Sequence, residues 1–508
     1  MPRSQHLSCF SHRPSQRALS IACSVGFALC DYCHAAALPI PMPIALARPQ
    51  QHYTQRIDIE PAQIADRATS INKADSNAAT STFTVNSAVD SHDSDPADGQ
   101  CLDASAYCSL RAAVEQSNAL SAYPPEIIIL PAGTYTLTLG ELVIKNSLDL
   151  QGAGAEQTFI DGNAQSRVIA IDGEASPILH FSGITIQNGN GGTFEAGGGI
   201  FVDEKATLAL FQCVVRNNKS TIFGGGISVA GQLQISQSTV QGNSLPLGSG
   251  GGQTSSGGGI FLFSSASVKI DKSTISGNVA TRGGGIRNVG GHLEISNSTI
   301  SGNIANTRGG GLMNYGTAFI SYSTIVYNQA NASLQGTIED AFGGGIYNVS
   351  GLDASGNPVG GTVSMGNTIL ALNTDRRDRL DPTHYSPDCY SVGAATFTSF
   401  RGNLVGVVNA QCNLRDSTWG DLRFDQAGRP DMPLDPLLDT LSNNGGFTHT
   451  HALRSDSPAI DKGTGITSAT FFDCPATDQR AESRPAGKEC DVGAFEKSVP
   501  ELQTQPEI

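Results

Sequence analysis

The chain has 508 residues and a formal net charge of −15, and charged residues make up 15% of it. Such an acidic chain lacks the basic face that nucleic-acid phosphates or anionic membrane surfaces require. Glycine is abundant, with 58 residues, but no Gly-X-Y period occurs, which excludes collagen. Few charges and aromatics, with many Gly, Ser, Thr, Asn and Ile residues, favour short strands joined by tight turns.

Residues 1–37 have the pattern of a secretory signal peptide. Three arginines precede the apolar run 18–30, and Ala35-Ala36-Ala37 offers small residues for cleavage. The run is too short to cross a bilayer, and no later segment is long and apolar enough to do so. We therefore expect a secreted or cell-surface protein without a transmembrane segment, with a disordered Pro-rich and polar linker over 38–80. The alternative is that the true start of the protein lies elsewhere and that these residues direct no export.

The cysteines after residue 37 fit an oxidising compartment. Three pairs are close in sequence: Cys101 and Cys108, Cys389 and Cys412, and Cys474 and Cys490. Many other pairings are formally open, so this connectivity is a hypothesis based on proximity. Cys213 lies in an expected strand and would then be a buried free thiol.

Residues 81–126 precede the repeats and are interpreted as an N-terminal cap. Ser109 can N-cap a short helix that covers the open apolar end of a stack of coils. The apolar face of that helix contains Leu110, Ala113 and Val114. Arg111 and Glu115 lie four residues apart and are expected to pair on its outer side.

The stretch before this helix is acidic. It contains Asp90, Asp93, Asp95 and Asp98. Their carboxylate oxygens make Ca²⁺ the one candidate cofactor. Full EF-hand spacing and a terminal bidentate glutamate are absent, so we favour the alternative of an acidic turn.

An internal repeat decides the expected fold. A glycine run followed by an aliphatic residue recurs along the chain, ending at Ile200, Ile227, Ile260, Ile286, Leu312 and Ile346. A second motif, of the type Ser-Thr-Ile-Ser-Gly-Asn, runs in phase with it. Short alternating runs within each unit place apolar residues on one face, which only a stack of units can bury.

The period is too short for a propeller blade, and the spacing of leucine-rich repeats is absent. We therefore predict an all-β fold, a right-handed parallel β-helix over 127–373, with a short N-terminal capping helix and a loop-rich C-terminal cap over 374–496. Residues 497–508 are then a tail.

The asparagines that close successive motifs should stack at one turn. These are Asn243, Asn278, Asn303 and Asn328. Each side-chain amide is expected to bond to those above and below it, as in the stacked amides of cross-β structures. Asn288, Asn314 and Asn348 form a second candidate column, and unrelated turn asparagines are the alternative.

Some side chains near the glycine runs are candidate ligand contacts. Arg282 and Arg308 should stack in neighbouring coils and, with Arg287, can bind an anionic sugar. Phe261 and Tyr347 follow their aliphatic landmark and can stack on sugar rings if they face outward. For the arginines, we favour the alternative of solvated surface side chains. For the aromatic rings, we favour packing in the core or between loops.

Catalysis is harder to support from the sequence. Hydrolysis of a glycoside needs two carboxylates at a defined separation. Acids within the clear repeat are sparse, namely Asp203, Glu204, Asp271, Glu294, Glu339 and Asp340. No Asp-x-Asp pair or aligned acid set is visible, so no catalytic residue is assigned.

The C-terminal part contains a further candidate cluster. His449 and His451 lie two residues apart, and Asp461, Asp478 and Asp491 are nearby in sequence. A metal or catalytic cluster is one interpretation, and we favour structural hydrogen bonding within a loop-rich cap.

Two segments resemble known families. Cys108 to Ala119, preceded by Phe83-Thr84-Val85-Asn86-Ser87, resembles the CSLREA motif of bacterial surface β-helix proteins, with Ala112 in place of the motif's glutamate. The C-terminal part resembles the choice-of-anchor Q domain, on the segments 435–437, 444–453, 457–461, 477–480, 484–485 and 490–496. This resemblance implies a secreted or surface β-helix, commonly of unassigned activity.

Together these patterns predict a monomeric, non-catalytic scaffold that presents a side surface to a polysaccharide or cell-surface glycan. The alternative is a polysaccharide lyase or glycoside hydrolase with a groove along the coils, and a third option is an inert structural component. Carboxylates from neighbouring coils that converge in a cleft would favour the enzyme, because fold alone does not fix function.

Overall fold

A computed structural model describes residues 81–120, 125–192, 196–246, 255–330, 341–352, 358–375, 385, 387–416, 424–464 and 470–498. The expected signal peptide, the linker and nearly all of the expected tail lie outside these residues.

Strands in four sheets make up most of the described chain. Sheet 1 contains, in stacking order, β1 (Thr82–Thr84), β2 (Glu126–Leu130), β5 (Leu148–Gly152), β8 (Ile178–Ser182), β11 (Thr207–Phe211), β14 (Gln232–Ser236), β17 (Ser267–Asp271), β21 (His292–Ser296), β25 (Thr317–Ser321), β30 (Thr362–Gly366), β34 (Thr396–Ser399) and β36 (Leu414–Asp416). Sheet 2 contains β3 (Gly133–Thr136), β6 (Thr158–Asp161), β9 (Thr185–Gln187), β12 (Val214–Arg216), β15 (Thr239–Gln241), β18 (Thr274–Ser276), β22 (Thr299–Ser301), β26 (Thr324–Val326), β31 (Ile369–Ala371), β35 (Leu404–Val405) and β37 (Gln426–Ala427).

The other two sheets complete the coils. Sheet 3 contains β4 (Leu142–Ile144), β7 (Ile169–Ile171), β10 (Ile200–Val202), β13 (Ile227–Val229), β16 (Ile260–Leu262), β20 (Ile286–Asn288), β24 (Leu312–Asn314), β28 (Ile346–Leu352), β29 (Pro358–Gly360) and β33 (Cys389–Val392). Sheet 4 contains β19 (Val279–Arg282), β23 (Ile304–Arg308), β27 (Gln329–Ala330) and β32 (Thr374–Asp375).

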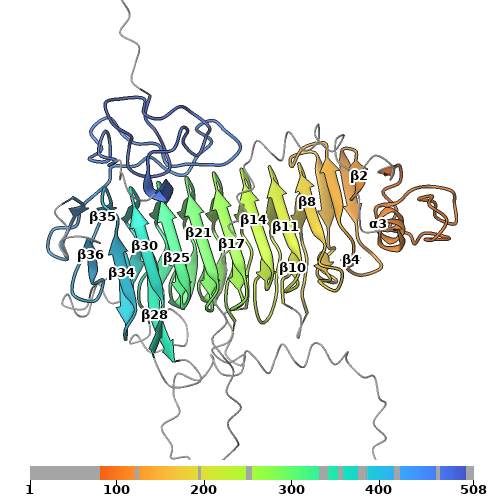
Figure 1. The fold of residues 1–508 in the computed structure, drawn as a ribbon, viewed down its shortest axis with the longest axis horizontal. Helices are drawn as coiled ribbons and strands as arrows, with labels where there is room; N and C mark the ends of the chain where they lie inside the picture. The colour runs from red at the N-terminus through yellow and green to blue at the C-terminus, as the bar shows by residue number, and fades with distance from the viewer. Residues whose placement is uncertain are drawn as a thin grey trace, which may run out of the picture. The chain divides into compact units, whose positions relative to one another are not determined.

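The coils from β2 to β33 pass through sheets 1, 2 and 3 in that order, and in the later of these coils a strand of sheet 4 lies between sheets 2 and 3. Neighbouring coils pair in parallel and in register, so Leu293 of β21 lies opposite Val268 of β17 and Ala318 of β25. Figure 1 shows the sheet 1 strands stacked in this sequence. The prediction of a right-handed parallel β-helix is confirmed, in the hand that parallel crossovers favour.

The strands extend beyond the range predicted for the coils, 127–373. At the N-terminal side β1 pairs with β2, and at the C-terminal side β33 to β37 continue sheets 1, 2 and 3. The expected C-terminal cap over 374–496 therefore begins with further coil strands. These coils lack the glycine runs and the Ser-Thr motif, which is why the repeat is not visible there.

The core is a column of aliphatic side chains inside the coils. On β21 the burial alternates, with Leu293 and Ile295 fully buried and their neighbours partly exposed. Stacking repeats this column from Phe83 of β1 to Leu414 of β36. Each fully buried aliphatic side chain contributes about 1.5–3 kcal/mol, and a single unit buries too little to be stable alone.

Each glycine of a run is required by the backbone around it, as Gly283, Gly284 and Gly285 illustrate. Gly283 has φ +61°, where a side chain is strained. A Cβ on Gly284 would lie 2.5 Å from the carbonyl oxygen of Ile304, and one on Gly285 would lie 2.6 Å from that of Gly311. The corner between sheets therefore leaves no room for any other residue.

An asparagine ladder runs through the corner after sheet 2. The ladder contains the four predicted asparagines and one more at each end, namely Asn218, Asn243, Asn278, Asn303, Asn328 and Asn373. From Asn243 onward, each Oδ1 accepts hydrogen bonds from the backbone N–H and the Nδ2 of the preceding asparagine, at 2.9–3.0 Å in the pair of Asn278 and Asn303. The Oδ1 of Asn218 accepts from the N–H of Gly189. Asn288, Asn314 and Asn348 form a second column through bonds of 2.9 Å. An amide suits this position because it donates and accepts at once.

A serine column, which the sequence analysis did not identify, lies at the corner before sheet 2. The backbone N–H of Ser238 donates to Ser273 Oγ, and the pattern repeats in the next coils. Cys213 occupies the first place in this column, where its N–H donates to Ser238 Oγ. It is a buried free thiol, as expected, and burial raises its pKa to about 12.

The N-terminal capping helix is α3 (Leu110–Ala119), which packs against β4 and β2. Ser109 caps it by accepting a hydrogen bond from the N–H of Ala112. The expected pairing of Arg111 with Glu115 is wrong. Arg111 is buried and bonds Asp90 at 2.7 Å, whereas Glu115 accepts from His92, because the acidic loop packs on this side of the helix.

The three expected disulfides are present, joining Cys101 to Cys108, Cys389 to Cys412, and Cys474 to Cys490. The first and third lie outside the coils, where irregular chain gains most from a crosslink, whereas Cys389 is the first residue of the coil strand β33. Among the described residues, no helix has the length and apolar character needed to cross a membrane.

The ladder generates a first prediction. Asn303→Ala removes the acceptor for Asn278 and the donor to Ile275 O and to Asn328, inside the core. We expect the free energy of unfolding to fall by about 3 kcal/mol or more, since buried partners lose their bonds. Chemical denaturation measures this. Gln232→Ala, at an exposed amide on β14, is the control, and equal stability of the two variants would contradict the ladder's role.

The end of the ladder generates a second prediction. Asp388 Oδ1 accepts from the N–H and Nδ2 of Asn373, and burial raises the pKa of Asp388 to about 7. An aspartate in the unfolded chain has a pKa of about 3.9. The native state therefore binds this proton more tightly, and the stability it contributes is lost as pH rises from about 4 through 7.

Asp388→Asn should flatten this pH dependence of the free energy of unfolding, measured by denaturant titration from pH 4 to pH 8. The exposed Asp456→Asn is the control and should keep the wild-type slope. A slope in Asp388→Asn that equals the wild-type slope would contradict the assignment.

Candidate functional site

The ligand residues expected near the glycine runs lie in a packed layer on sheets 3 and 4. Phe261, Arg287 and Tyr347 occupy one column of that sheet, and their exposed fractions are 1%, 1% and 3%. Arg282 is also buried, and it lies in register with the half-buried Arg308, as the stacking prediction required.

Aromatic rings and guanidinium groups fill this layer. Phe261 stacks on Phe223 with ring centroids 4.3 Å apart, and Arg287 lies over Tyr315 at 5.3 Å. Arg308 lies over Tyr347 at 5.5 Å. Buried rings cannot stack on a sugar unless the layer opens, so the arrangement matches the packing alternative.

The four aspartates of the acidic loop have different hydrogen-bond partners. Although burial by itself raises the pKa of Asp90, hydrogen bonds from Arg111 and the backbone hold that pKa below its usual value. Asp93, Asp95 and Asp98 each accept a hydrogen bond from a backbone N–H two residues later. Within the described part of the chain, no three His, Cys, Asp or Glu side chains gather as a metal site.

The C-terminal histidines and aspartates also have separate, structural partners. His451 Nδ1 donates to the carbonyl of Asp439, and its Nε2 accepts from Ser301 at 2.9 Å. Burial lowers the pKa of His451, which keeps the ring neutral. His449 is exposed, and Asp478 pairs with Arg480. The favoured interpretation, structural hydrogen bonding, describes this arrangement.

The C-terminal segment that contains them, residues 434–464 and 470–498, lies along the outer face of sheet 2. Gln479 receives a hydrogen bond from Thr299 and donates to Thr274, and the N–H of Ala494 donates to Thr324. The expected loop-rich segment is thus attached to the side of β18, β22 and β26.

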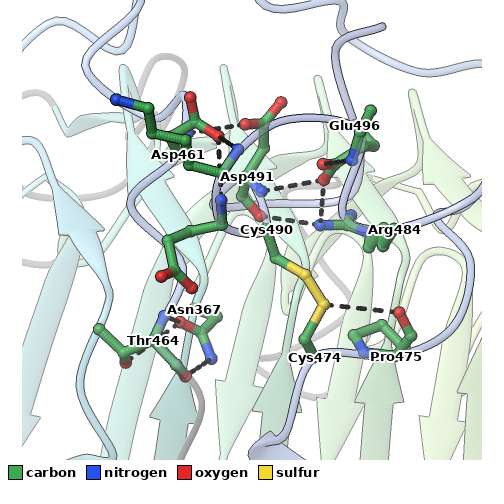
Figure 2. The surroundings of a disulfide bond; sticks show 12 residues. Asn367, Asp461, Thr464, Cys474, Pro475, Arg484, Cys490, Asp491 and Glu496 are labelled. Atoms are coloured by element: carbon green, nitrogen blue, oxygen red, sulfur yellow. Dashed lines mark hydrogen bonds and ion pairs between the residues drawn. A yellow bond between two sulfur atoms is a disulfide. The ribbon is translucent and has the colours of Figure 1, made fainter.

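The interior of this segment contains an apolar cluster, which it shares with the coils, and a group of buried polar side chains. Arg484 Nη1 lies 3.2 Å from Glu496 and donates to the carbonyl of Asp491, and the two charged side chains have exposed fractions of 0% and 1%. Figure 2 shows this group beside the disulfide between Cys474 and Cys490. Arg484 also lies over the ring of Tyr322, 5.0 Å away, on the corner before sheet 2.

The same segment brings an aromatic ring to sheet 1. Residues Thr470–Phe472 form the short helix η5. Phe472 is buried, stacks on Phe400 at 4.4 Å and has its carbonyl bonded by Asn367 Nδ2. This anchor places Phe471 against Phe319 of β25, with ring centroids 6.1 Å apart.

Around this contact, β17, β21 and β25 carry polar and aromatic side chains on their outer face, which we call the β17–β25 patch. It consists of Lys269, Asp271, His292, Glu294, Phe319 and Phe471. All six are partly exposed.

In-register stacking sets the geometry of the patch. Lys269, Glu294 and Phe319 form one column across three coils. His292 lies 3.1 Å from Glu294 and its ring centroid is 5.5 Å from that of Phe319. Asp271 accepts hydrogen bonds from Ser296 and Asn297 at its Oδ1 only.

This arrangement offers ring faces for the C–H surface of a sugar, with carboxylates and an ammonium group for its hydroxyls. Asp271 and Glu294 share one sheet face in adjacent coils, but they do not align, because Asp271 lies opposite Ser296 and Glu294 lies opposite Lys269. The sequence analysis did not identify this patch. A signal did exist in the sequence. Lys269 and Glu294 each stand four residues before the Ser-Thr motif of their coil, at Ser273 and Ser298. Phe471 had no such signal, because it comes from outside the repeat.

No family model matches the chain, and no curated protein matches it. Among solved structures it is similar to the pectin methylesterase PemA from Erwinia chrysanthemi, with 13% identity and a TM-score of 0.32 over 57% of this chain and 89% of that one. It is also similar to a mannuronic acid-specific family 6 polysaccharide lyase from human gut microbiota, with 13% identity and a TM-score of 0.28 over 68% and 79% of the two chains.

A third similar structure is the PL6 family alginate lyase AlyGC, with 14% identity and a TM-score of 0.29 over 72% of this chain and 59% of that one.

The attachment of the C-terminal segment generates a third prediction. Arg484→Ala leaves Glu496 as a buried carboxylate without its cation, which costs about 3–5 kcal/mol. We expect the segment to become sensitive to limited proteolysis while the coils stay resistant. Arg429→Ala, at an exposed pair with Asp431, is the control and should keep wild-type resistance. Equal proteolysis of both variants would contradict this role for Arg484.

Proposed function

We propose that this protein is an extracytoplasmic β-helix scaffold that binds a polysaccharide through the β17–β25 patch, without turning it over. The observation that carries the proposal is the ring pair of Phe319 and Phe471, flanked by Glu294 and His292 on the adjacent coil. Aromatic rings beside fixed hydrogen-bonding groups suit an extended sugar chain that crosses successive coils.

The charge of the patch favours a neutral polysaccharide. Lys269 is offset by Asp271 and Glu294 on the same face, and the whole chain has a formal net charge of −15. An anionic polysaccharide would be repelled over distances of about a Debye length, roughly 10 Å at moderate salt.

Export is part of this proposal. The three disulfides fit a compartment in which disulfides persist. The signal-peptide pattern in residues 1–37 and the resemblance to CSLREA and choice-of-anchor Q proteins support a place at the cell surface or in the medium.

A glycoside hydrolase is the second candidate, favoured by Asp271 and Glu294 on one face. Strands about 4.8 Å apart and residues rising about 3.3 Å along a strand put their Cα atoms roughly 8 Å apart. Inverting glycosidases hold their two carboxyl groups about 6.5–9.5 Å apart. This Cα spacing lets the two side chains reach such a separation, and both lie on the outer face of sheet 1.

Binding tests the first proposal. We expect the full chain to bind at least one neutral polysaccharide in affinity electrophoresis, and Phe319→Ala with Phe471→Ala to weaken binding about tenfold or more through the loss of stacking. Phe447→Ala removes an exposed ring of the C-terminal segment outside the patch and should bind as wild type. Retained binding in the double variant would contradict the assignment of the patch.

Product release separates the two candidates in the same samples. Non-catalytic binding predicts no new reducing or unsaturated ends on any bound polysaccharide. Release that Glu294→Gln or Asp271→Asn abolishes, with binding intact, would establish the hydrolase instead.

A further inference from the structure

A polar hollow lies away from the patch, at the corner that follows sheet 2 in the N-terminal coils. Its volume is about 770 Å³. Its polar lining includes Asp161, Asn163, Asn188, Asn190, Asn217 and Lys219. Pockets of about 300–1,000 Å³ are the usual size for small organic ligands.

The asparagine amides in the hollow are not required by the turn. Asn188 and Asn217 have φ angles of 54° and 55°, and the next coils have Gly242, Gly277 and Gly302 at the same register position with φ of 61°, 62° and 66°. Glycine alone therefore satisfies the left-handed backbone at this corner. Asn188 and Asn217 thus carry side-chain amides that the backbone conformation at this corner does not require.

Several of these polar groups remain available for a ligand. Within the described residues, the side chains of Asn163, Asn217 and Lys219 make no hydrogen bond and are exposed. Asn188 uses its Nδ2 to bond Asp161 at 2.7 Å, which leaves its Oδ1 for a ligand.

The carboxylate oxygens of Asp161 already accept hydrogen bonds from within the protein. Its Oδ2 accepts from Gln187 at 2.9 Å as well as from Asn188, and its Oδ1 accepts from the N–H of Asn163. One ammonium group, from Lys219, is the other charge in the lining. The hollow as a whole therefore offers neutral donors and acceptors side by side.

Side-chain amides donate and accept, which matches the hydroxyl groups of a sugar. We propose that this hollow binds a short neutral oligosaccharide through the side-chain amides of Asn188 and Asn217. The site lies on a different sheet from the β17–β25 patch and does not depend on the function proposed for that patch.

Ligand-observed saturation-transfer NMR on the full chain tests the proposal. The probes are mannotetraose, cellotetraose and galactotetraose, with tetragalacturonate as the anionic counterpart. We expect a neutral tetrasaccharide to bind, and Asn188→Gly with Asn217→Gly to weaken binding about fivefold or more for each lost amide. Glycine is the residue that the later coils carry here, so the double variant should fold.

The matched control is Asn413→Gly, an exposed asparagine with φ of 50° outside the hollow, and it should bind as wild type. Phe319→Ala with Phe471→Ala should leave the tetrasaccharide signal intact, since these rings belong to the patch.

The proposal would be overturned if no neutral tetrasaccharide binds, if the glycine double variant binds as wild type, or if tetragalacturonate is preferred and Lys219→Gln removes its binding. If instead the phenylalanine double variant abolishes the signal, the tetrasaccharide occupies the patch, and the hollow is not its site. Failure of polysaccharide binding at the patch, by contrast, leaves the amide variants as an independent test.

Discussion

Hydrogen bonding between coils in unshifted register is the constraint on which the rest of this structure depends. Because parallel strands pair at a spacing of about 4.8 Å, each residue has an equivalent residue above and below it. Inside the coils this favours repeated aliphatic residues, and at the corners it favours residues that bond to copies of themselves. The asparagine ladder from Asn218 to Asn373 is the clearest case, because an amide donates upward and accepts from below.

The same register leaves the outward positions free to vary. The column of Lys269, Glu294 and Phe319 has a different side chain in every coil, although its backbone is uniform. The corner with Asn188 and Asn217 likewise keeps one backbone conformation while its side chains change. Function in such a fold lies in outward columns, where packing does not fix the residue, and both surfaces proposed here are of that kind.

The C-terminal segment adds what the repeat alone does not supply. Its interior contains a buried ion pair and a disulfide, and it joins the coils through hydroxyl and amide bonds and through an apolar cluster that it shares with Val326, Ile369 and Leu404. It binds the outer face of β18, β22 and β26, whereas the hollow lies over earlier strands of sheet 2. It also brings Phe471 to sheet 1, so one segment supports two faces of the coils.

The sequence by itself determined the β-helix, the ladder, the three disulfides and the free thiol of Cys213, because each follows from a repeat or from short separations along the chain. Only the tertiary structure decided that Arg287 and Phe261 are buried, that Arg111 pairs with Asp90, and that Phe471 reaches Phe319. These contacts join segments with no common period, and no local pattern encodes where an irregular loop folds back onto the coils.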